Sequence, residues 1–485
     1  LSFTIRMKFT PISSALLTAT LFLDQRSASV CLGKVISIVS PEESSGEEVD
    51  SSNFRRRLKL PSKRPSKRPS KRPSKSPTKR VTKAPTMDIH QSLKIICDFF
   101  GMKNTTECSN YYSFKGFTKF GTIPTEIGLL TMLTDLTMLT RSNMIPSTIG
   151  LLTNLRNLNL LCYLESRVNT TTISSSIGRL TNLNTLSLTS CKYTNPIPSE
   201  IRRLRQLNTL DLARNQFQGP LPDLDGLTAL TKLYLEDNAF TGTLPTSLIQ
   251  LRRLTEFQIQ LNKFSGEISV VGNLTGLQNF DASSNEFVGS IPNSLGSLSA
   301  LSYLDIARNK LNGTIPSSIG NLIYLKDMHL NRNALTGTIP TSLGNLTLME
   351  RIFLSENELT GTIPSSIGNL TWIQILDLSV NSLNGTIPDS FGNLHNAYTL
   401  NVSNNLLGGI IPSSIGNLSS LSTTDFQNNQ FTGAVPDTFC EVRYFSDFNY
   451  TLEVIVDCQE VTCNCCLDSG RNPCTPYNLS VLSRE

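Results

Sequence analysis

A short sequence pattern recurs about every 24 residues through most of this 485-residue chain, and it limits the possible folds more than any other feature. Its clearest mark is a Thr-Ile-Pro tripeptide or a close variant. The proline position of this tripeptide falls at residues 124, 146, 174, 198, 222, 245, 269, 292, 316, 340, 364, 388, 412 and 436, and Pro fills all of them except Ser174 and Ser269. A fixed period of this length indicates a repeat protein in which each unit stacks on the next.

Each unit follows one frame, and residues 298–316 illustrate it as L-x-x-L-x-x-L-x-L-x-x-N-x-L-x-G-x-I-P. The L-x-L pair alternates with a period of two, which predicts a short strand with both leucines buried. The frame recurs as thirteen units between residues 130 and 436. One unit cannot bury its apolar face alone, so we expect all thirteen to share one continuous core.

The asparagine position of the frame is expected to hold the units together. It is filled by Asn at residues 215, 238, 262, 285, 309, 333, 357, 381, 405 and 429, and by Cys191 before them. An amide side chain both donates and accepts hydrogen bonds, so stacked asparagines can satisfy backbone groups that no strand pairs. Gly allows the tight backbone that follows, and Pro fixes φ where no backbone donor is needed.

This frame resembles that of the plant-type leucine-rich repeat proteins over about 310 residues. The resemblance implies an α/β solenoid, that is, a leucine-rich repeat horseshoe or superhelix with a parallel β-sheet on its concave face, about 13 repeats of ~24 residues and cysteine-containing caps. At ~4.8 Å per strand the sheet would be roughly 60 Å long. That length is ample for a protein interface of about 800 Å² per partner.

The variable positions that face outward from the expected strands are the candidate ligand-binding residues on the concave face. In repeats five to ten they are Tyr234, Glu236, Asp237, Gln258, Tyr303, Asp305, Arg308, His329, Arg332, Arg351 and Phe353. Exposed aromatic and Arg side chains are the residues that dominate binding at protein interfaces. The alternative interpretation is a solvated face with a few unused aromatic side chains.

The sequence contains no recognisable catalytic, cofactor-binding or metal-binding motif. Its three histidines, His90, His329 and His395, lie far apart along the chain. Asp recurs at the strand centres, at residues 211, 281, 305, 377 and 425, but Asp is the ordinary residue at this position of plant-type repeats. We therefore predict a protein that is not an enzyme and that requires no cofactor or metal.

Two functions of different classes fit these observations. The first is a secreted or cell-surface leucine-rich repeat recognition module that binds a protein, peptide or glycan ligand on the concave face. The second is a structural extracellular-matrix or cell-wall protein that is tethered by a basic Pro-rich arm. A localised binding patch on the concave face favours the first function, and a uniformly polar face favours the second. The fold alone does not name the ligand.

The first 29 residues have the layout of a secretory signal. Lys8 precedes an apolar run, residues 9–23, and the small residues Ser27, Ala28 and Ser29 follow, after which cleavage is expected. The run is short for a membrane span, and an uncleaved signal anchor is the alternative. Both interpretations predict a protein that is secreted or displayed on the cell surface.

Charge is unevenly distributed along the chain. Residues 55–83 carry 14 Lys and Arg and no acidic residue, whereas residues 84–485 carry 25 Lys and Arg against 32 Asp and Glu, a net charge of −7. Residues 30–85, acidic and then basic and rich in Pro and Ser, are expected to form a disordered linker. Its basic part is either an arm for a polyanionic matrix or membrane surface, or a solvated spacer. The acidic body is not expected to share that attraction, and no nucleic-acid partner is expected.

Cysteines are expected to close the exposed core at both ends of the array, in an N-terminal cap of residues 86–129 and a C-terminal cap of residues 437–485. The candidates for disulfide bonds are Cys97, Cys108, Cys162, Cys191, Cys440, Cys458, Cys463, Cys465, Cys466 and Cys474. A zinc knuckle in the C-terminal tail is the less favoured alternative to disulfide bonds there. The tail resembles that of secreted leucine-rich repeat proteins of diatoms.

Cys162 and Cys191 lie in neighbouring repeats. Cys191 is expected one strand across the sheet from Cys162 and one residue further along the strand. This displacement predicts about 5.8 Å between their Cα atoms, which is within the range of a disulfide bond. Two buried free thiols are the alternative.

Eleven N-x-[ST] sequons are candidates for N-glycosylation. They begin at Asn104, Asn169, Asn273, Asn312, Asn345, Asn369, Asn384, Asn401, Asn417, Asn449 and Asn478. Most of them are expected away from the concave face. Asn401 is the exception, because it is expected on a strand and facing outward, where a glycan would close the C-terminal end of the sheet.

Overall fold

The computed structural model describes residues 89–101, 112–117, 122–140, 144–162, 172–438, 453–457, 461–463 and 466. The chain divides into two units, 1–81 and 82–485, and all the described residues belong to the second. The expected signal segment 1–29 and linker 30–85 lie outside the described residues and stay predictions. In the part of the chain that is described, no helix has both the length and the apolar character that crossing a membrane requires.

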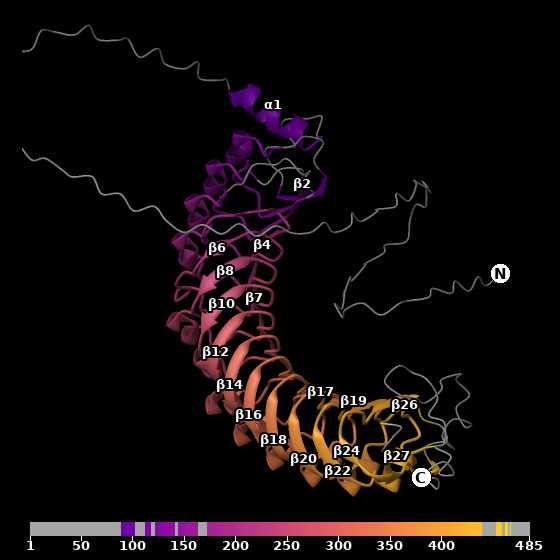
Figure 1. Cartoon of the computed structure of the whole chain (residues 1–485). Helices are drawn as coiled ribbons and strands as arrows, with labels where there is room; N and C mark the ends of the chain where they lie inside the picture. The colour runs from indigo at the N-terminus through magenta and orange to yellow at the C-terminus, as the bar shows by residue number, and fades with distance from the viewer. Residues whose placement is uncertain are drawn as a thin grey trace, which may run out of the picture. The chain divides into compact units, whose positions relative to one another are not determined.

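A parallel sheet of fifteen strands forms the concave face of the repeat array (Figure 1). In order, its strands in the described residues are β1 (Ser113–Phe117), β2 (Asp135–Thr140), β3 (Asn157–Cys162), β4 (Thr185–Thr189), β5 (Thr209–Asp211), β7 (Lys232–Tyr234), β9 (Glu256–Gln258), β11 (Asn279–Asp281), β13 (Tyr303–Asp305), β15 (Asp327–His329), β17 (Arg351–Phe353), β19 (Ile375–Asp377), β21 (Thr399–Asn401), β23 (Thr423–Asp425) and β26 (Glu453–Ile455). Each of the thirteen predicted repeats contributes one strand to this sheet, from β2 to β23. Strands β1 and β26 extend the sheet by one strand at each end. The predicted leucine-rich repeat solenoid is confirmed.

The apolar positions of the frame form one continuous core. In β13, Leu304 is fully buried between the half-buried side chains of Tyr303 and Asp305, as the alternation of a strand requires. Burial of one such Leu stabilises the fold by about 1.5–3 kcal/mol. The buried side chains form a single cluster that extends from Ile96, in the N-terminal helix α1 (Ile89–Phe99), to Cys466.

A second parallel sheet, which the sequence analysis does not predict, follows the concave strands within the repeats. In the described residues its strands are β6 (Gln218–Gly219), β8 (Ala239–Gly242), β10 (Lys263–Gly266), β12 (Glu286–Ser290), β14 (Lys310–Thr314), β16 (Ala334–Gly337), β18 (Glu358–Thr362), β20 (Ser382–Gly385), β22 (Leu406–Gly409) and β24 (Gln430–Phe431). They cover the L-x-G part of the frame, where Gly313 adopts a φ of 69° that only glycine reaches without steric cost. Two short strands, β25 (Gly433–Ala434) and β27 (Val461–Thr462), pair near the C-terminal end.

Short 3₁₀ helices line the convex side of the array (Figure 1). In the described residues they are η1 (Thr125–Leu129), η2 (Ser147–Leu151), η3 (Ser175–Arg179), η4 (Ser199–Arg203), η5 (Thr246–Gln250), η6 (Ser269–Asn273), η7 (Asn293–Ser297), η8 (Ser317–Asn321), η9 (Thr341–Asn345), η10 (Ser365–Asn369), η11 (Asp389–Asn393) and η12 (Ser413–Asn417). An extended Pro precedes most of them; Pro316 before η8, for example, has φ −71°.

The assignment of Ser269 to the proline position is wrong. Helix η6 begins at Ser269 itself, and the residue before it is the fully buried Ile268, with ψ of 10° instead of the extended value found at the prolines. This repeat is therefore one residue shorter than its neighbours, and Ile268 fills the place of both the apolar residue and the proline.

The asparagine position forms the predicted ladder between repeats. The Oδ1 atom of Asn285 accepts a hydrogen bond from the backbone N–H of Phe264, at 3.0 Å, in the preceding repeat. Its Nδ2 atom donates to the carbonyl oxygen of Ile259 at 2.9 Å and to those of Ala282 and Ser283, both at 3.2 Å. The same pattern is found from Asn215 to Asn429, so each asparagine ties its own turn to the repeat before it.

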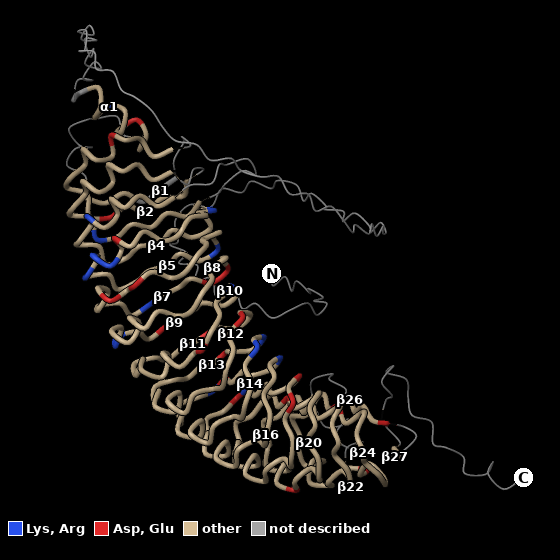
Figure 2. Tube along the Cα trace, turned by 60° about the vertical axis from the view of Figure 1, so that its left-hand side comes forward, with Lys and Arg blue, Asp and Glu red and all other residues tan. Residues whose placement is uncertain are grey.

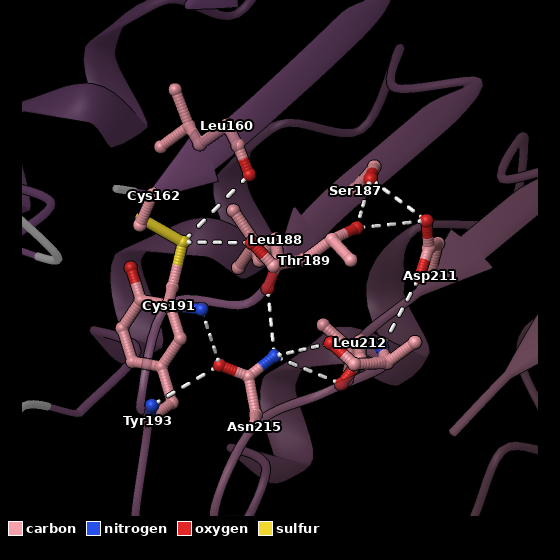
Figure 3. The surroundings of a disulfide bond; sticks show 11 residues. Leu160, Cys162, Ser187, Leu188, Thr189, Cys191, Tyr193, Asp211, Leu212 and Asn215 are labelled. Carbon is pink, nitrogen blue, oxygen red and sulfur yellow. Dashed lines mark hydrogen bonds between the residues drawn. A yellow bond between two sulfur atoms is a disulfide. The ribbon is translucent and has the colours of Figure 1, made fainter. Parts of the chain in front are cut away.

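The Cys162–Cys191 disulfide bond closes the N-terminal end of this ladder (Figure 3). The Cα atoms are 4.8 Å apart, and the predicted bond is confirmed. The backbone N–H of Tyr193, two residues after Cys191, donates to Oδ1 of Asn215 at 3.2 Å, as the second residue after each asparagine does in the ladder, so Cys191 occupies an asparagine position. Its sulfur lies 3.7 Å from the carbonyl oxygen of Leu160, where an asparagine would donate a hydrogen bond. A covalent bond thus replaces an amide contact between repeats two and three.

Disulfide bonds are also found in both expected cap regions. Cys97, which is fully buried in α1, is disulfide-bonded, and Cys463 is bonded to Cys466 near the C-terminal end. The candidates that lie outside the described residues are Cys108, Cys440, Cys458, Cys465 and Cys474.

Seven of the sequons lie among the described residues. Six have exposed Asn side chains away from the concave sheet, at the ends of 3₁₀ helices or in the second sheet: Asn273, Asn312, Asn345, Asn369, Asn384 and Asn417. Asn401 lies on the concave strand β21, where its Oδ1 accepts hydrogen bonds from the N–H and Oγ of Ser403 at 3.0 and 2.8 Å. Asn104, Asn169, Asn449 and Asn478 lie outside the described residues, and glycosylation at all eleven stays a prediction.

Candidate ligand-binding face

All eleven candidate residues lie on the concave strands or directly after them, in two groups. The first group comes from β7 and β9, where Tyr234 and Gln258 are opposite one another, and from the residues after β7. The second group comes from the neighbouring strands β13, β15 and β17. Asp237, Arg308 and Arg332 do not lie within the strands, because each occupies the turn that follows, with φ of 54°, 55° and 59°.

The second group is centred on three aromatic rings, those of Tyr303, His329 and Phe353, which we call the aromatic cluster. The ring centroids of Tyr303 and His329 are 5.6 Å apart, and those of His329 and Phe353 are 4.6 Å apart. All three side chains are half-buried. Ring pairs at such separations attract one another by about 0.5–1.5 kcal/mol, so the rings hold each other in place before any ligand arrives.

An ion pair fixes the edge of this cluster. Arg351 donates from Nε to Oδ1 of Asp327 and from Nη2 to Oδ2 at 3.1 Å, which is a bidentate arrangement. The pairing raises the pKa of Arg351 further above its usual range. Asp327 is not among the candidates, although the frame places it 24 residues before Arg351 in the same outward position. That spacing is the signal that would have identified it.

Burial controls the charge of the groups beside the aromatic cluster. It raises the pKa of Asp305 to about 7, with help from the charge of Asp281 on the neighbouring strand β11. Burial also lowers the pKa of His329 to about 4. Between pH 4 and 7 both groups are neutral, so the 4.0 Å contact between Nδ1 of His329 and Oδ2 of Asp305 is not an ion pair in that range.

The pKa of Asp305 predicts a pH-dependent stability. Its folded value of about 7 exceeds the unfolded value of roughly 3.9, so between these values the folded protein binds more protons than the unfolded chain. The free energy of unfolding should therefore rise as pH falls from 7.5 to 5.5. Urea unfolding across this range should show a weaker rise for Asp305→Asn. The rise should be steeper in His329→Gln, because unfolded His329 takes up a proton near pH 6.5 and folded His329 only near pH 4, so this residue opposes the rise in the wild type. An unchanged rise in Asp305→Asn would contradict this assignment.

In the first group of candidates, Tyr234 is engaged by neighbouring side chains. The Tyr234 hydroxyl donates to Glu256, and Lys232 lies 2.7 Å from the same carboxylate. Burial raises the pKa of Glu236 to about 7. Lys232 and Glu256, like Asp327, lie on the concave strands but are not among the binding residues expected from the sequence.

Comparisons with known proteins agree with this architecture. The model of the Leucine Rich Repeat family matches residues 229–251, 276–298, 300–322, 324–346, 349–370, 372–394 and 396–418. These seven segments lie within the more regular part of the thirteen-repeat array. A search of curated proteins found no match.

Several solved structures are similar to the chain. The plant peptide hormone receptor RGFR1 in complex with RGF2 is 32% identical, with a TM-score of 0.62, over 74% of this chain and 59% of that one. The PEPR1–AtPEP1 structure is 30% identical, with a TM-score of 0.64, over 76% of this chain and 54% of that one. The leucine-rich repeat ectodomain of the plant membrane receptor kinase GASSHO1/SCHENGEN3 from Arabidopsis thaliana, in complex with CASPARIAN STRIP INTEGRITY FACTOR 2, is 27% identical, with a TM-score of 0.61, over 75% and 51%.

The chain thus spans between 51% and 59% of the length of these three receptor chains. The repeat frame, the fifteen-stranded concave sheet, the asparagine ladder and these likenesses agree with one another. The chain is a leucine-rich repeat protein of the plant type.

Proposed function

We propose that the chain is an extracellular recognition module, without catalytic activity, that binds a peptide or an extended protein segment on its concave face over β13, β15 and β17. The observation that carries this proposal is the aromatic cluster, which presents three preorganised, half-exposed rings beside the Asp327–Arg351 ion pair. A ligand that covers the rings gains about 25 cal/mol for each Å² of apolar surface buried. Rings that are already ordered lose little entropy on binding.

The surroundings of the cluster indicate the chemistry of the ligand. Arg308 and Arg332 lie in the turns after β13 and β15, and Arg332 shares its charge with Glu356 through a 2.6 Å contact. Asp305 is half neutral near pH 7. An apolar or aromatic ligand residue next to an acidic group would fit this combination of rings and guanidinium groups.

The similar receptor structures support a peptide ligand and an extracellular location for this chain. These structures contain RGF2, AtPEP1 and CASPARIAN STRIP INTEGRITY FACTOR 2, and the last is of a receptor ectodomain. A glycan ligand is the competing possibility, because aromatic rings also stack on sugars, and it is distinguished by the experiment below.

A random library of displayed 12-residue peptides tests the proposal. Peptides selected on the full wild-type chain should bind Phe353→Ala at least about tenfold more weakly, which is the loss typical of a central aromatic contact. Tyr324→Ala is the matched control, because Tyr324 is an exposed aromatic residue, at 56%, that lies outside the concave strands. This variant should bind like the wild type.

Two results would contradict the peptide proposal. One is a library that yields no peptide able to distinguish wild type from Phe353→Ala. The other is specific binding of neutral oligosaccharides that depends on Phe353 while peptides show none. Thermal unfolding of each variant checks that the array is intact, since truncating a half-buried side chain at the surface should leave it folded.

A further inference from the structure

Basic residues gather on one part of the array outside the concave sheet. Seven exposed arginines in repeats two to six lie outside the concave strands, and we call them the arginine strip: Arg156, Arg179, Arg202, Arg203, Arg205, Arg252 and Arg253. Figure 2 shows this concentration of Lys and Arg beside β2, β4 and β9. In the described residues between Arg156 and Arg253, the acidic residues outside the concave strands and the turns after them are Glu200, Asp223 and Asp225, so the arginines outnumber them. The body's net charge of −7 conceals this strip.

The charges of the strip are free to act on a partner. Within the described residues, none of the seven arginines has a carboxylate within the 4.0 Å of an ion pair. The later repeats differ. Between residues 268 and 438, the basic residues other than the concave candidates are Lys310 and Lys326, and both are paired with glutamates, at 3.0 and 3.1 Å.

A hydroxyl-lined groove lies along this strip. It has a volume of about 410 Å³ and runs across the convex helices η2, η3 and η4. Its walls carry the hydroxyl groups of Ser147, Thr148 and residues 174–176, together with Arg179, Arg203 and Glu200. Arg179 and Arg203 are the last residues of η3 and η4, so the repeat places them in the same position of adjacent units.

We propose that the arginine strip binds an acidic polysaccharide, with its sulfate or carboxylate groups on the arginines and its sugar hydroxyls in the groove. The planar fork of an Arg side chain binds such oxyanions through two parallel hydrogen bonds. Hydroxyl groups in the groove complement the hydroxyls of a sugar backbone. No aromatic side chain lines the groove, so it lacks the stacking surfaces by which proteins hold single-stranded nucleic acids.

The dimensions favour a polymer over a small ion. The arginines span repeats two to six, with an interruption in repeat five, and at ~4.8 Å per repeat this span is about 20 Å long. It also lies outside the concave face, so a polysaccharide on the strip would leave the aromatic cluster open. Binding at the strip therefore does not depend on the proposed function. It would give the chain a second surface for acidic polymers, besides the basic segment 55–83.

The experiment compares three forms of the full chain on immobilised dextran sulfate, polygalacturonate and neutral dextran. Arg179→Gln/Arg203→Gln should bind the acidic polymers at least about fivefold more weakly than wild type in 150 mM salt, because two charge-assisted contacts are lost. Lys310→Gln/Lys326→Gln removes the same number of positive charges from the later repeats, outside both proposed sites, and should stay within about twofold of wild type. Neutral dextran should bind none of the three. A preference for dextran sulfate would assign sulfate as the recognised group, and a preference for polygalacturonate would assign carboxylate.

Equal binding by all three forms would overturn the proposal, because residues 55–83, which are unchanged in every form, would then supply all the attraction. Thermal unfolding should be unaffected, since both arginines are exposed. If the double Gln variant were nevertheless unstable, Arg179→Lys/Arg203→Lys keeps the charge and removes the fork. It should bind with intermediate affinity, and wild-type affinity would overturn the role of the guanidinium groups.

Discussion

Replacing Asn285 with Ala should lower the free energy of unfolding by about 3 kcal/mol. Asn285 is buried, at 8% exposure, and makes one accepted and three donated contacts to backbone groups of two repeats. Removing its amide leaves these buried groups unsatisfied, at about 1–3 kcal/mol for each group that finds no new partner. Urea unfolding followed by circular dichroism measures the change.

Asn321→Ala is the matched control for this prediction. Asn321 is exposed at the end of η8 and lies outside the ladder. Its replacement should change the free energy of unfolding by less than about 0.5 kcal/mol. Similar losses in the two variants would show that the ladder does not hold the repeats together.

Replacing Gly226 with Ala should lower the free energy of unfolding by about 3 kcal/mol or more. The repeat that contains Gly226 has no 3₁₀ helix between η4 and η5 in the structure described, and its backbone approaches the previous repeat closely. A Cβ atom at Gly226 would lie 1.8 Å from the carbonyl oxygen of Arg202, so the backbone of one repeat must shift. Overpacking against backbone is more costly than overpacking against a flexible side chain.

Gly408→Ala provides the control, since a Cβ atom there would have its nearest neighbour, the carbonyl oxygen of Gln430, at 3.4 Å. This substitution should change the free energy of unfolding by no more than about 1 kcal/mol. Calorimetric scans of both variants compare the two sites directly. A loss below about 1 kcal/mol for Gly226→Ala would mean that the close approach is not tight in solution.

The repeat frame predicts the fold well because it repeats the same physical requirement thirteen times. Leu304 and Ile306 alternate as a strand must, and the asparagine position appears wherever the turn leaves backbone groups unpaired. The second sheet is not predictable in the same way. Strand β14 contains one fully buried side chain, Leu311, so no alternation is visible, and the strand exists only because stacked repeats bring its neighbours alongside.

The candidate face is predictable in its position but not in its chemistry. The frame identifies Phe353 and His329 as outward-facing, yet only the register of β15 and β17 brings their rings together. The 24-residue spacing puts Asp327 and Arg351 in the same outward position, but only the structure shows that they form an ion pair. The arginine strip is missed for a related reason, because a sum of charges over the whole body averages a basic surface with acidic ones.

Photo-cross-linking locates the ligand most directly. A library-selected peptide that carries a benzoylphenylalanine in place of its aromatic residue would be irradiated in complex with the full wild-type chain, and mass spectrometry would then identify the modified residues. The account predicts adducts on the concave strands β13, β15 and β17, and their loss when unlabelled peptide competes. Adducts confined to the convex 3₁₀ helices or to the second sheet would contradict it.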